Sequence, residues 1–276
     1  MTTQEQEQTR AAWDTIAAGY DQFVTPSHMW LANEALRLAG LRPGMRFLDV
    51  AAGSGALGIP AARLGAEVLA ADLSPIMVER LEARARQEGL SKLEARVMDG
   101  HALELEDDTF DISGSQFGVM LFPDLPLALR EMARVTKPGG KVVVVTFGNP
   151  MEIEFFGFFI GAIQAAVPGF TGPPMDPPPI ASQIVDPEVF RSQMARAGLK
   201  DIKIDTVTEK LEFKSGKHLW DWLLGSNPLA TMMTADLSKE QVGVVQDAME
   251  KMIRERAAGS GTAVLTNPIH IGVGTK

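Results

Sequence analysis

The stretch RFLDVAAGSGALGIPAARLG, residues 46–65, opens with the short apolar run of a buried parallel strand. Gly53, Ser54 and Gly55 follow. The two glycines let the backbone turn sharply and approach a ligand closely, because they carry no Cβ. The next residues predict a helix, whose first backbone N–H groups are free to bind a ligand. A strand, a glycine turn and a helix in this order predict an α/β fold with its ligand site at the turn.

Two ligand classes fit this turn. Gly53, Gly55 and Gly58 match the G-x-G-x-x-G pattern of dinucleotide-binding proteins. Asp72 ends the next predicted strand, and a carboxylate there can hold a ribose diol in an NAD enzyme and in a methyltransferase alike. Asp49, at the end of the first strand, separates the two classes, because it disfavours a phosphate but can accept hydrogen bonds from an ammonium group. The turn therefore favours S-adenosylmethionine, with an NAD-dependent oxidoreductase as the alternative.

Further motifs follow in a fixed order along about half of the chain. They are LDVAAGSG, AADLSP, VMDGHAL, FDISGSQFGVMLFPD and REMARVTKPGG, preceded by AAWDTIAAGYDQF at residues 11–23. This series resembles the class I S-adenosylmethionine-dependent methyltransferases, and within them the small-molecule subgroup of the ubiquinone/menaquinone C-methyltransferases. Ala51 and Ala52 replace a more usual glycine-containing pair. The sequence after Phe147 departs much further, so the resemblance does not identify the methyl acceptor.

The resemblance implies a doubly wound, Rossmann-like α/β fold with a seven-stranded, mostly parallel sheet. Its last strand is expected to run antiparallel beside the fifth, inside the sheet. The N-terminal segment is predicted as two helices joined at residues 25–27. We expect a single methyltransferase domain over residues 1–276, with an N-terminal helical cover (1–40), a cofactor-binding core (42–147) and lid insertions that contribute to the substrate site (151–185 and 214–258).

The same resemblance implies which residues hold S-adenosylmethionine and its product S-adenosylhomocysteine. Asp72 is expected to accept the ribose hydroxyls, Asp99 to accept the adenine amino group, and Tyr20 to reach the methionine end. Leu73 or Met77 is expected to pack on the adenine face, because that ring needs an apolar slot. The full expected set is Tyr20, Asp49, Ala51, Gly53, Gly55, Asp72, Leu73, Met77, Asp99, Gly100, His101 and Ser115.

No catalytic base stands out in the sequence, which has no cysteine and no His–Asp pair at a diagnostic spacing. Methyl transfer from a sulfonium is an in-line displacement with an activated leaving group, so we expect alignment and exclusion of water to carry it. Tyr20 and His28 are the candidates for a catalytic role, although His28 can equally be read as a surface-loop histidine. Trp30, Phe117 and Phe156 are expected to line a pocket for a small hydrophobic or aromatic acceptor.

Composition bears on the remaining function classes. The net charge of −9 and the lack of a basic run argue against nucleic acid, whose phosphates need clustered Lys and Arg. No metal site is expected, because the sequence shows no metal-ligand cluster. The longest apolar segment, residues 155–167, is too short to span a bilayer, and the polar N-terminus is unlike a signal peptide, so a cytoplasmic protein is expected. A homo-oligomer and a cofactor-binding regulatory protein without turnover stay open.

Overall fold

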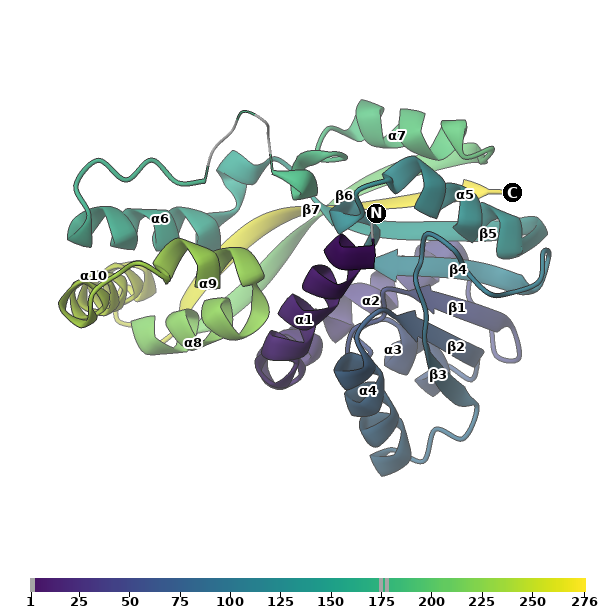
Figure 1. The fold of residues 1–276 in the computed structure, drawn as a ribbon, viewed down its shortest axis with the longest axis horizontal. Helices are drawn as coiled ribbons and strands as arrows, with labels where there is room; N and C mark the ends of the chain where they lie inside the picture. Colours follow the sequence, from purple (N-terminus) through teal and green to yellow (C-terminus); the bar gives the residue numbers. More distant parts are fainter. Residues whose placement is uncertain (1–2, 174–175, 177–178) are drawn as a thin grey trace.

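The computed structural model describes residues 3–173, 176 and 179–276. Within these residues, the fold is built on a seven-stranded sheet of order β3-β2-β1-β4-β5-β7-β6 (Figure 1). The strands are β1 (Arg46–Val50), β2 (Glu67–Asp72), β3 (Leu93–Val97), β4 (Phe110–Gln116), β5 (Thr136–Phe147), β6 (Lys200–Phe213) and β7 (Ala263–Thr275). Strands β1 to β5 pair in parallel, whereas β7 runs antiparallel to both of its neighbours, β5 and β6. The predicted doubly wound sheet, with its last strand inside, is confirmed.

Helices lie on both faces of this sheet (Figure 1). They are α1 (Thr3–Gly19), α2 (Thr25–Ala39), α3 (Gly58–Arg63), α4 (Pro75–Gln87), α5 (Leu125–Val135), α6 (Glu154–Ala166), α7 (Pro187–Arg196), α8 (Gly216–Ser226), α9 (Pro228–Thr234) and α10 (Lys239–Ala257). The start of α4 shows how the sequence sets a helix end, since the Ser74 hydroxyl accepts a hydrogen bond from the backbone N–H of Met77 and Pro75 fills the first turn.

The strand order reverses between β1 and β4, which pair although β2 and β3 lie between them in the chain. Sheets of this kind bind ligands at such a point, outside the carboxyl ends of the strands. Phe47 and Leu48 of β1 are fully buried, so the turn that follows Val50 starts from a fixed position in the core. Helix α1 lies across this end of the sheet (Figure 1).

The two predicted N-terminal helices are present, but their joint lies elsewhere than expected. A π-helical turn, Tyr20–Val24, links α1 to α2, and the backbone stays right-handed helical through Gly19 and Thr25. Pro26 does not break the chain because it occupies the first turn of α2, where an N–H has no partner within the helix. Turns of this type are frequent at functional sites, and this one begins at the single tyrosine of the chain.

A second group of helices surrounds the far ends of β6 and β7, away from the other strands (Figure 1). Helices α6, α8 and α10 pack there around a separate hydrophobic core that includes Phe159, Phe213 and Leu219. Phe147, at the end of β5, packs against this core and against the core of the sheet. Among the described residues, no helix has both the length and the apolar character needed to cross a membrane.

Candidate functional site

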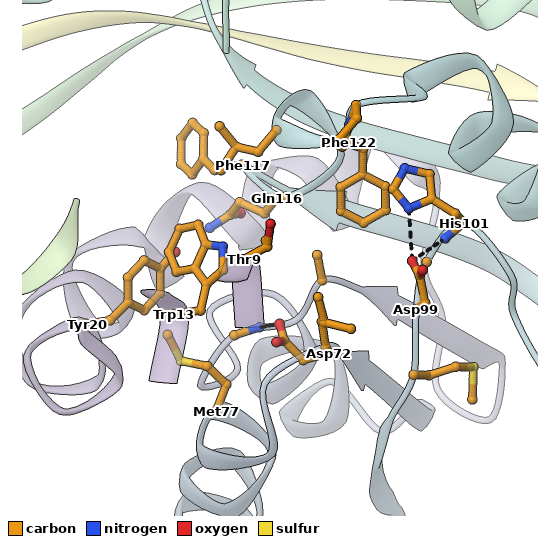
Figure 2. A pocket seen from close by; sticks show the side chains of 18 residues that line it. Thr9, Trp13, Tyr20, Asp72, Met77, Asp99, His101, Gln116, Phe117 and Phe122 are labelled. Carbon is orange, nitrogen blue, oxygen red and sulfur yellow. Dashed lines mark hydrogen bonds and ion pairs between the residues drawn. The ribbon is translucent and has the colours of Figure 1, made fainter. Parts of the chain in front are cut away.

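A pocket opens beneath α1, where β1, β2 and β4 end (Figure 2). Its empty space, including open solvent at the mouth, amounts to about 740 Å³. The fold brings most of the expected cofactor residues to its wall, namely Tyr20, Ala51, Gly53, Asp72, Leu73, Met77, Asp99, Gly100 and His101.

Asp72, the last residue of β2, closes the glycine turn. Its Oδ2 accepts a 2.8 Å hydrogen bond from the N–H of Gly53, and its Oδ1 accepts one of 2.8 Å from the N–H of Ser74. Burial raises the pKa of Asp72 to about 6 in spite of these two N–H groups, and the negative charge of Asp14 adds to the rise. A carboxylate can accept about four hydrogen bonds, so lone pairs are left for the two hydroxyls of a ribose.

Asp99, His101 and Phe122 form one end of the pocket (Figure 2). Oδ1 of Asp99 accepts a 2.9 Å hydrogen bond from the backbone N–H of His101 and lies 2.9 Å from the ring Nδ1 of the same residue. The rings of His101 and Phe122 are 4.6 Å apart between centroids. A Cβ at Gly100 would lie 2.6 Å from the ring of Phe122, so glycine is required here for the ring to reach the pocket.

Tyr20 forms the opposite end and faces the glycine turn, with its Cε1 3.3 Å from the position that a Cβ at Gly53 would take. Gly53 has a φ of +54°, in the left-handed region that favours glycine. The ring of Trp13 stands edge-on to that of Tyr20 at 6.0 Å between centroids. Burial, followed by the charges of Asp72 and Asp49, raises the pKa of Tyr20 above its usual range. The phenol therefore keeps its proton and can donate a hydrogen bond.

Asp49, Gly55 and Ser115 are not among the residues of the pocket wall. The carboxylate of Asp49 is buried and faces Gly58, where a Cβ would lie 3.0 Å from Oδ2. Burial raises its pKa well above the usual range. Ser115 is fully buried, and its hydroxyl accepts a 3.2 Å hydrogen bond from the N–H of Val119. Direct contacts of these three residues with a cofactor therefore stay predictions.

Helix α1 covers the pocket and is tied to both sides of it. The side-chain amide of Gln6 donates a 3.0 Å hydrogen bond to Oδ2 of Asp99, and the Ser74 hydroxyl donates one of 2.5 Å to Asp14. Trp13 adds to the wall between these two ties. The N-terminal part of the expected cover thus lies over the site, whereas the lining residues within the described chain include none from the expected lid.

The candidates for acceptor chemistry are spread over two places. Phe117 lines the pocket. His28 is buried behind it, and its Nε2 lies 3.0 Å from Oε1 of Glu209. Trp30 is 42 % exposed, and Phe156 packs against the second core. Roles for Trp30 and Phe156 in the acceptor pocket stay predictions.

Four residues of interest were missed from sequence: Gln6, Gln116, Phe122 and Glu209. Gln116 and Phe122 line the pocket. Gln116 is the last residue of β4 and Phe122 lies in the turn after it, where the order of side chains cannot be read from spacing. Glu209 had a usable signal. It is buried on the same face of β6 as Leu211 and Phe213, so strict alternation places a carboxylate on an apolar face.

The charges of the site discriminate between its two candidate ligands. Asp72 lies beside the turn and raises the pKa of Tyr20, and no Lys or Arg is among the described residues that line this pocket, so the turn is a poor place for a pyrophosphate. The glycine cradle at Gly53, the free lone pairs of Asp72 and the apolar slot beside Met77 suit a nucleoside with an uncharged or cationic tail. The residues therefore fit S-adenosylmethionine better than NAD.

Comparison with known proteins agrees with this fit. The model of the ubiE/COQ5 methyltransferase family matches residues 1–162. The chain belongs to this family. It is 32 % identical over 155 residues to a demethylmenaquinone methyltransferase of Streptomyces avermitilis, covering 56 % of this chain and 62 % of the relative. It is 32 % identical over 168 residues to the enzyme of the same name in Bacillus subtilis, covering 57 % and 70 %.

Other relatives set limits on the likeness. A Mycobacterium tuberculosis protein is 41 % identical over 143 residues, or 52 % of this chain and 50 % of its own, so the chain spans about half the length of such curated relatives. Haemonchus contortus phosphoethanolamine N-methyltransferase 2 in complex with S-adenosyl-L-methionine is a structural neighbour at a TM-score of 0.54 and 20 % identity, covering 89 % of this chain and 52 % of that one. The [4+2]-cyclase SpnF is another, at 0.53 and 18 %, covering 90 % and 80 %. At these identities the neighbours establish the fold alone.

Proposed function

We propose that this protein transfers a methyl group from S-adenosylmethionine to a small hydrophobic or aromatic acceptor. One observation carries the proposal: Asp72 closes a glycine turn at the switch point of the sheet while Asp99 stands at the other end of the same pocket. This arrangement matches the ribose and adenine of one nucleoside, and it occurs in a chain of the ubiE/COQ5 methyltransferase family.

Each end of the pocket has a task in this reaction. Asp72 accepts the ribose hydroxyls, and Asp99 accepts the adenine amino group beside the rings of His101 and Phe122. Tyr20 donates its phenol hydrogen near the turn, at the end where the methionine part lies. Bound S-adenosylmethionine supplies an electrophilic methyl group on a sulfonium. Helix α1 keeps water from that end, so alignment of donor and acceptor carries the rate.

The acceptor class follows from the wall opposite the turn. Phe117 lines the pocket beside Gln116 and Leu121, which gives an aromatic face with a single amide. Two relatives are named for demethylmenaquinone, and their names point to the same class of acceptor. The described residues hold no group of three or more His, Asp or Glu suited to a metal, and the proposed reaction asks for none.

Calorimetry and a transfer assay test the proposal together. S-adenosylhomocysteine and S-adenosylmethionine should bind and NAD should not. Label should pass from methyl-labelled S-adenosylmethionine to members of a panel of phenols, hydroquinones, amines and thiols. Asp72→Ala should weaken binding by about tenfold or more, whereas Asp205→Ala, an exposed carboxylate on β6, should leave it unchanged.

The alternatives give different results in the same experiment. NAD binding without a signal from the adenosyl compounds contradicts the proposal in favour of an oxidoreductase. Tight S-adenosylhomocysteine binding with no transfer to any acceptor contradicts turnover and leaves a cofactor-binding regulatory protein. The second outcome has a physical basis, because a cyclase shares this fold, so the fold alone does not fix the reaction.

A further inference from the structure

Five aromatic rings form a closed circuit between the sheet and the second group of helices. His28 lies 5.0 Å from Phe117 between ring centroids, and Phe117 stacks on Phe147 at 4.5 Å. Phe147 then meets Phe155 at 5.8 Å, and Phe155 meets Trp222 at 5.1 Å. Trp222 closes the circuit at 6.2 Å from His28. We call these five residues the ring box; its sides come from α2, the end of β4, the end of β5, α6 and α8.

A buried polar group backs the ring box. Oε1 of Glu209 lies 3.0 Å from Nε2 of His28, and the exposed fractions of the two side chains are 0 % and 3 %. Oε2 of Glu209 accepts a 2.9 Å hydrogen bond from the side-chain amide of Asn267, also fully buried. Glu209 and Asn267 face each other across the β6–β7 ladder. Burying a carboxylate costs several kcal/mol unless partners stabilise it, so its place beside a single histidine calls for an explanation.

Several polar atoms around the box lack a partner. Among the described residues, Nδ1 of His28, Nε1 of Trp222 and Oε1 of Gln116 are buried without an aligned hydrogen-bond partner. Native interiors leave few such atoms unsatisfied, and those that occur often mark a functional site. A ligand hydroxyl group can pair with these atoms, because its hydrogen can be donated to the His28 nitrogen or the Gln116 oxygen and its oxygen can accept from the N–H of Trp222.

The contact with Glu209 decides which histidine nitrogen is basic. A carboxylate 3.0 Å from Nε2 favours the tautomer that carries its proton on Nε2, because a lone pair there would face a negative charge. Nδ1 then holds the free lone pair of the ring. Among the described residues neither ring nitrogen of His28 has an aligned hydrogen-bond partner, but Nε2 has the Glu209 carboxylate 3.0 Å away, so the lone pair on Nδ1 is the one that can take a proton from something that is not part of the protein.

The ring box adjoins the cofactor pocket. Phe117 belongs to both, and Gln116 lines the pocket while its side-chain amide donates a 3.2 Å hydrogen bond to the carbonyl of His28. Phe117 also has a φ of +59°, a left-handed backbone that is strained for a bulky residue, and such strain clusters at functional sites. With this backbone conformation, the ring of Phe117 lies between the cofactor pocket and His28.

We infer that the ring box receives the acceptor, that the acceptor is an aromatic hydroxyl compound, and that His28 is its catalytic base. Glu209 is a positioning residue that keeps the imidazole in the Nε2–H form. The inference rests on the proposed methyl transfer. It adds to it a site for the acceptor ring, stacked among aromatic side chains, and a destination for the proton.

The step balances as follows. Nδ1 of His28 takes the hydroxyl proton as the O–H bond breaks, and the oxygen keeps the electron pair. That pair forms the bond to the methyl carbon while the carbon–sulfur bond breaks and its electrons stay on sulfur as a thioether. The imidazole leaves the step as a cation beside Glu209, whose carboxylate stabilises it, and it later releases its proton to water. No oxidant or reductant is needed.

A purely structural role of the His28–Glu209 pair would give different results. If His28 and Glu209 only hold α2 to the β6–β7 ladder, a substitution weakens every reaction of the protein alike. A base matters only while the nucleophile still carries its proton at the working pH. At about pH 8, phenol keeps its proton and 4-nitrophenol has largely lost it, so the two probes separate the roles at that pH.

The experiment compares wild type, His28→Gln, Glu209→Gln and, as a matched control, His218→Gln, a partly exposed histidine of α8 in the second group of helices. Transfer from methyl-labelled S-adenosylmethionine is measured with phenol, 1,4-dihydroxynaphthalene and 4-nitrophenol. His28→Gln should lower kcat by about 10²–10⁴-fold for the weakly acidic phenol and by less than about tenfold for 4-nitrophenol. Glu209→Gln should show a smaller loss with the same trend, and His218→Gln none.

Two further readouts do not depend on turnover. S-adenosylhomocysteine should bind His28→Gln as tightly as wild type, which shows an intact fold and cofactor pocket. Nitrogen NMR of imidazole-labelled protein, with His28 assigned from the variant that lacks it, should find its proton on Nε2 and its lone pair on Nδ1.

The outcomes separate the inference from the function on which it rests. Equal losses with all three phenols, an unchanged kcat in His28→Gln, or a proton on Nδ1 overturns the role of His28. Transfer to amines or thiols but to none of the phenols overturns the acceptor class while the methyltransferase stands. Failure of wild type to bind S-adenosylhomocysteine overturns the proposed function, and the inference with it.

Discussion

Asp72 should make cofactor affinity depend on pH. In the free protein, burial raises the pKa of Asp72 from its ordinary 3.8 to about 6, with the charge of Asp14 adding to the effect. Two ribose hydroxyls that donate to this carboxylate stabilise its ionised form, so binding lowers the pKa and releases a proton. The affinity for S-adenosylhomocysteine should therefore rise with pH up to about 6 and then level off.

The size of the effect follows from the pKa of the free protein. With a pKa of about 6, roughly one carboxyl group in ten is ionised at about pH 5. Binding that requires the ionised form is then about tenfold weaker at pH 5 than at pH 8. In Asp72→Asn the charge-assisted bonds are lost, which weakens binding by roughly 1.5–3 kcal/mol at neutral pH and removes the pH dependence.

Calorimetry from pH 5 to pH 8, in buffers of different ionisation enthalpy, measures both affinity and proton release. Asp14→Asn is the matched control. Asp14 raises the pKa of Asp72, so its neutralisation should move the midpoint of the affinity curve towards acid without flattening it. A wild-type affinity that is constant across this range, or an Asp72→Asn variant that keeps the wild-type slope, refutes the reasoning.

The same pKa has a consequence for stability, with a definite sign. The folded protein holds the Asp72 proton more tightly than the unfolded chain, so this group's contribution to stability is complete below about pH 4. It is lost as the pH rises through the folded pKa of about 6. The melting temperature of ligand-free wild type, measured relative to that of Asp72→Asn, should therefore decrease as the pH is raised from about 4 to about 6.

Three further substitutions test the geometry of the pocket and its cover. Gly100→Ala places a Cβ 2.6 Å from the ring of Phe122, so calorimetry should show that S-adenosylhomocysteine binds about tenfold more weakly. Unchanged binding would show that the position of Phe122 does not matter for the cofactor. Gly19→Ala meets Gly225 of α8 at 2.6 Å and should destabilise the protein by about 1–3 kcal/mol in urea unfolding, and a neutral result contradicts the close crossing of α1 and α8. Gln6→Ala frees Oδ2 of Asp99 and should tighten S-adenosylhomocysteine binding by up to about tenfold, whereas weaker binding would mean that Gln6 supports the cofactor and does not compete with it.

The cofactor end of the site could be predicted because its parts are local. Gly53 and Asp72 each stand at the end of a predicted strand, and parallel strands bring their carboxyl ends to one edge without further information. Asp99 follows the third strand in the same way. For Asp49 the position near the strand end was predicted but the direction of the side chain was not: side chains alternate within a strand, and the carboxylate faces Gly58, so its contact with a cofactor stays a prediction.

The proposed acceptor end could not be predicted in this way, because its parts come from elements with no local relation. Glu209 reaches His28 only because β6 extends well past the sheet and pairs with β7 along its full length, a register that no short motif encodes. Trp222 looked like packing from its spacing, and it does pack, with a buried N–H that the packing leaves without a partner.

Helix α8 connects the two halves of the site. At Gly225 its backbone meets Gly19 of α1, the helix that covers the cofactor pocket. One turn earlier it contributes Trp222 to the ring box. Packed interiors have low compressibility and transmit strain, so a shift of α1 on cofactor binding must move α8 or open the crossing. The segment that resembled known methyltransferases least thus lies where donor and acceptor would have to be brought together.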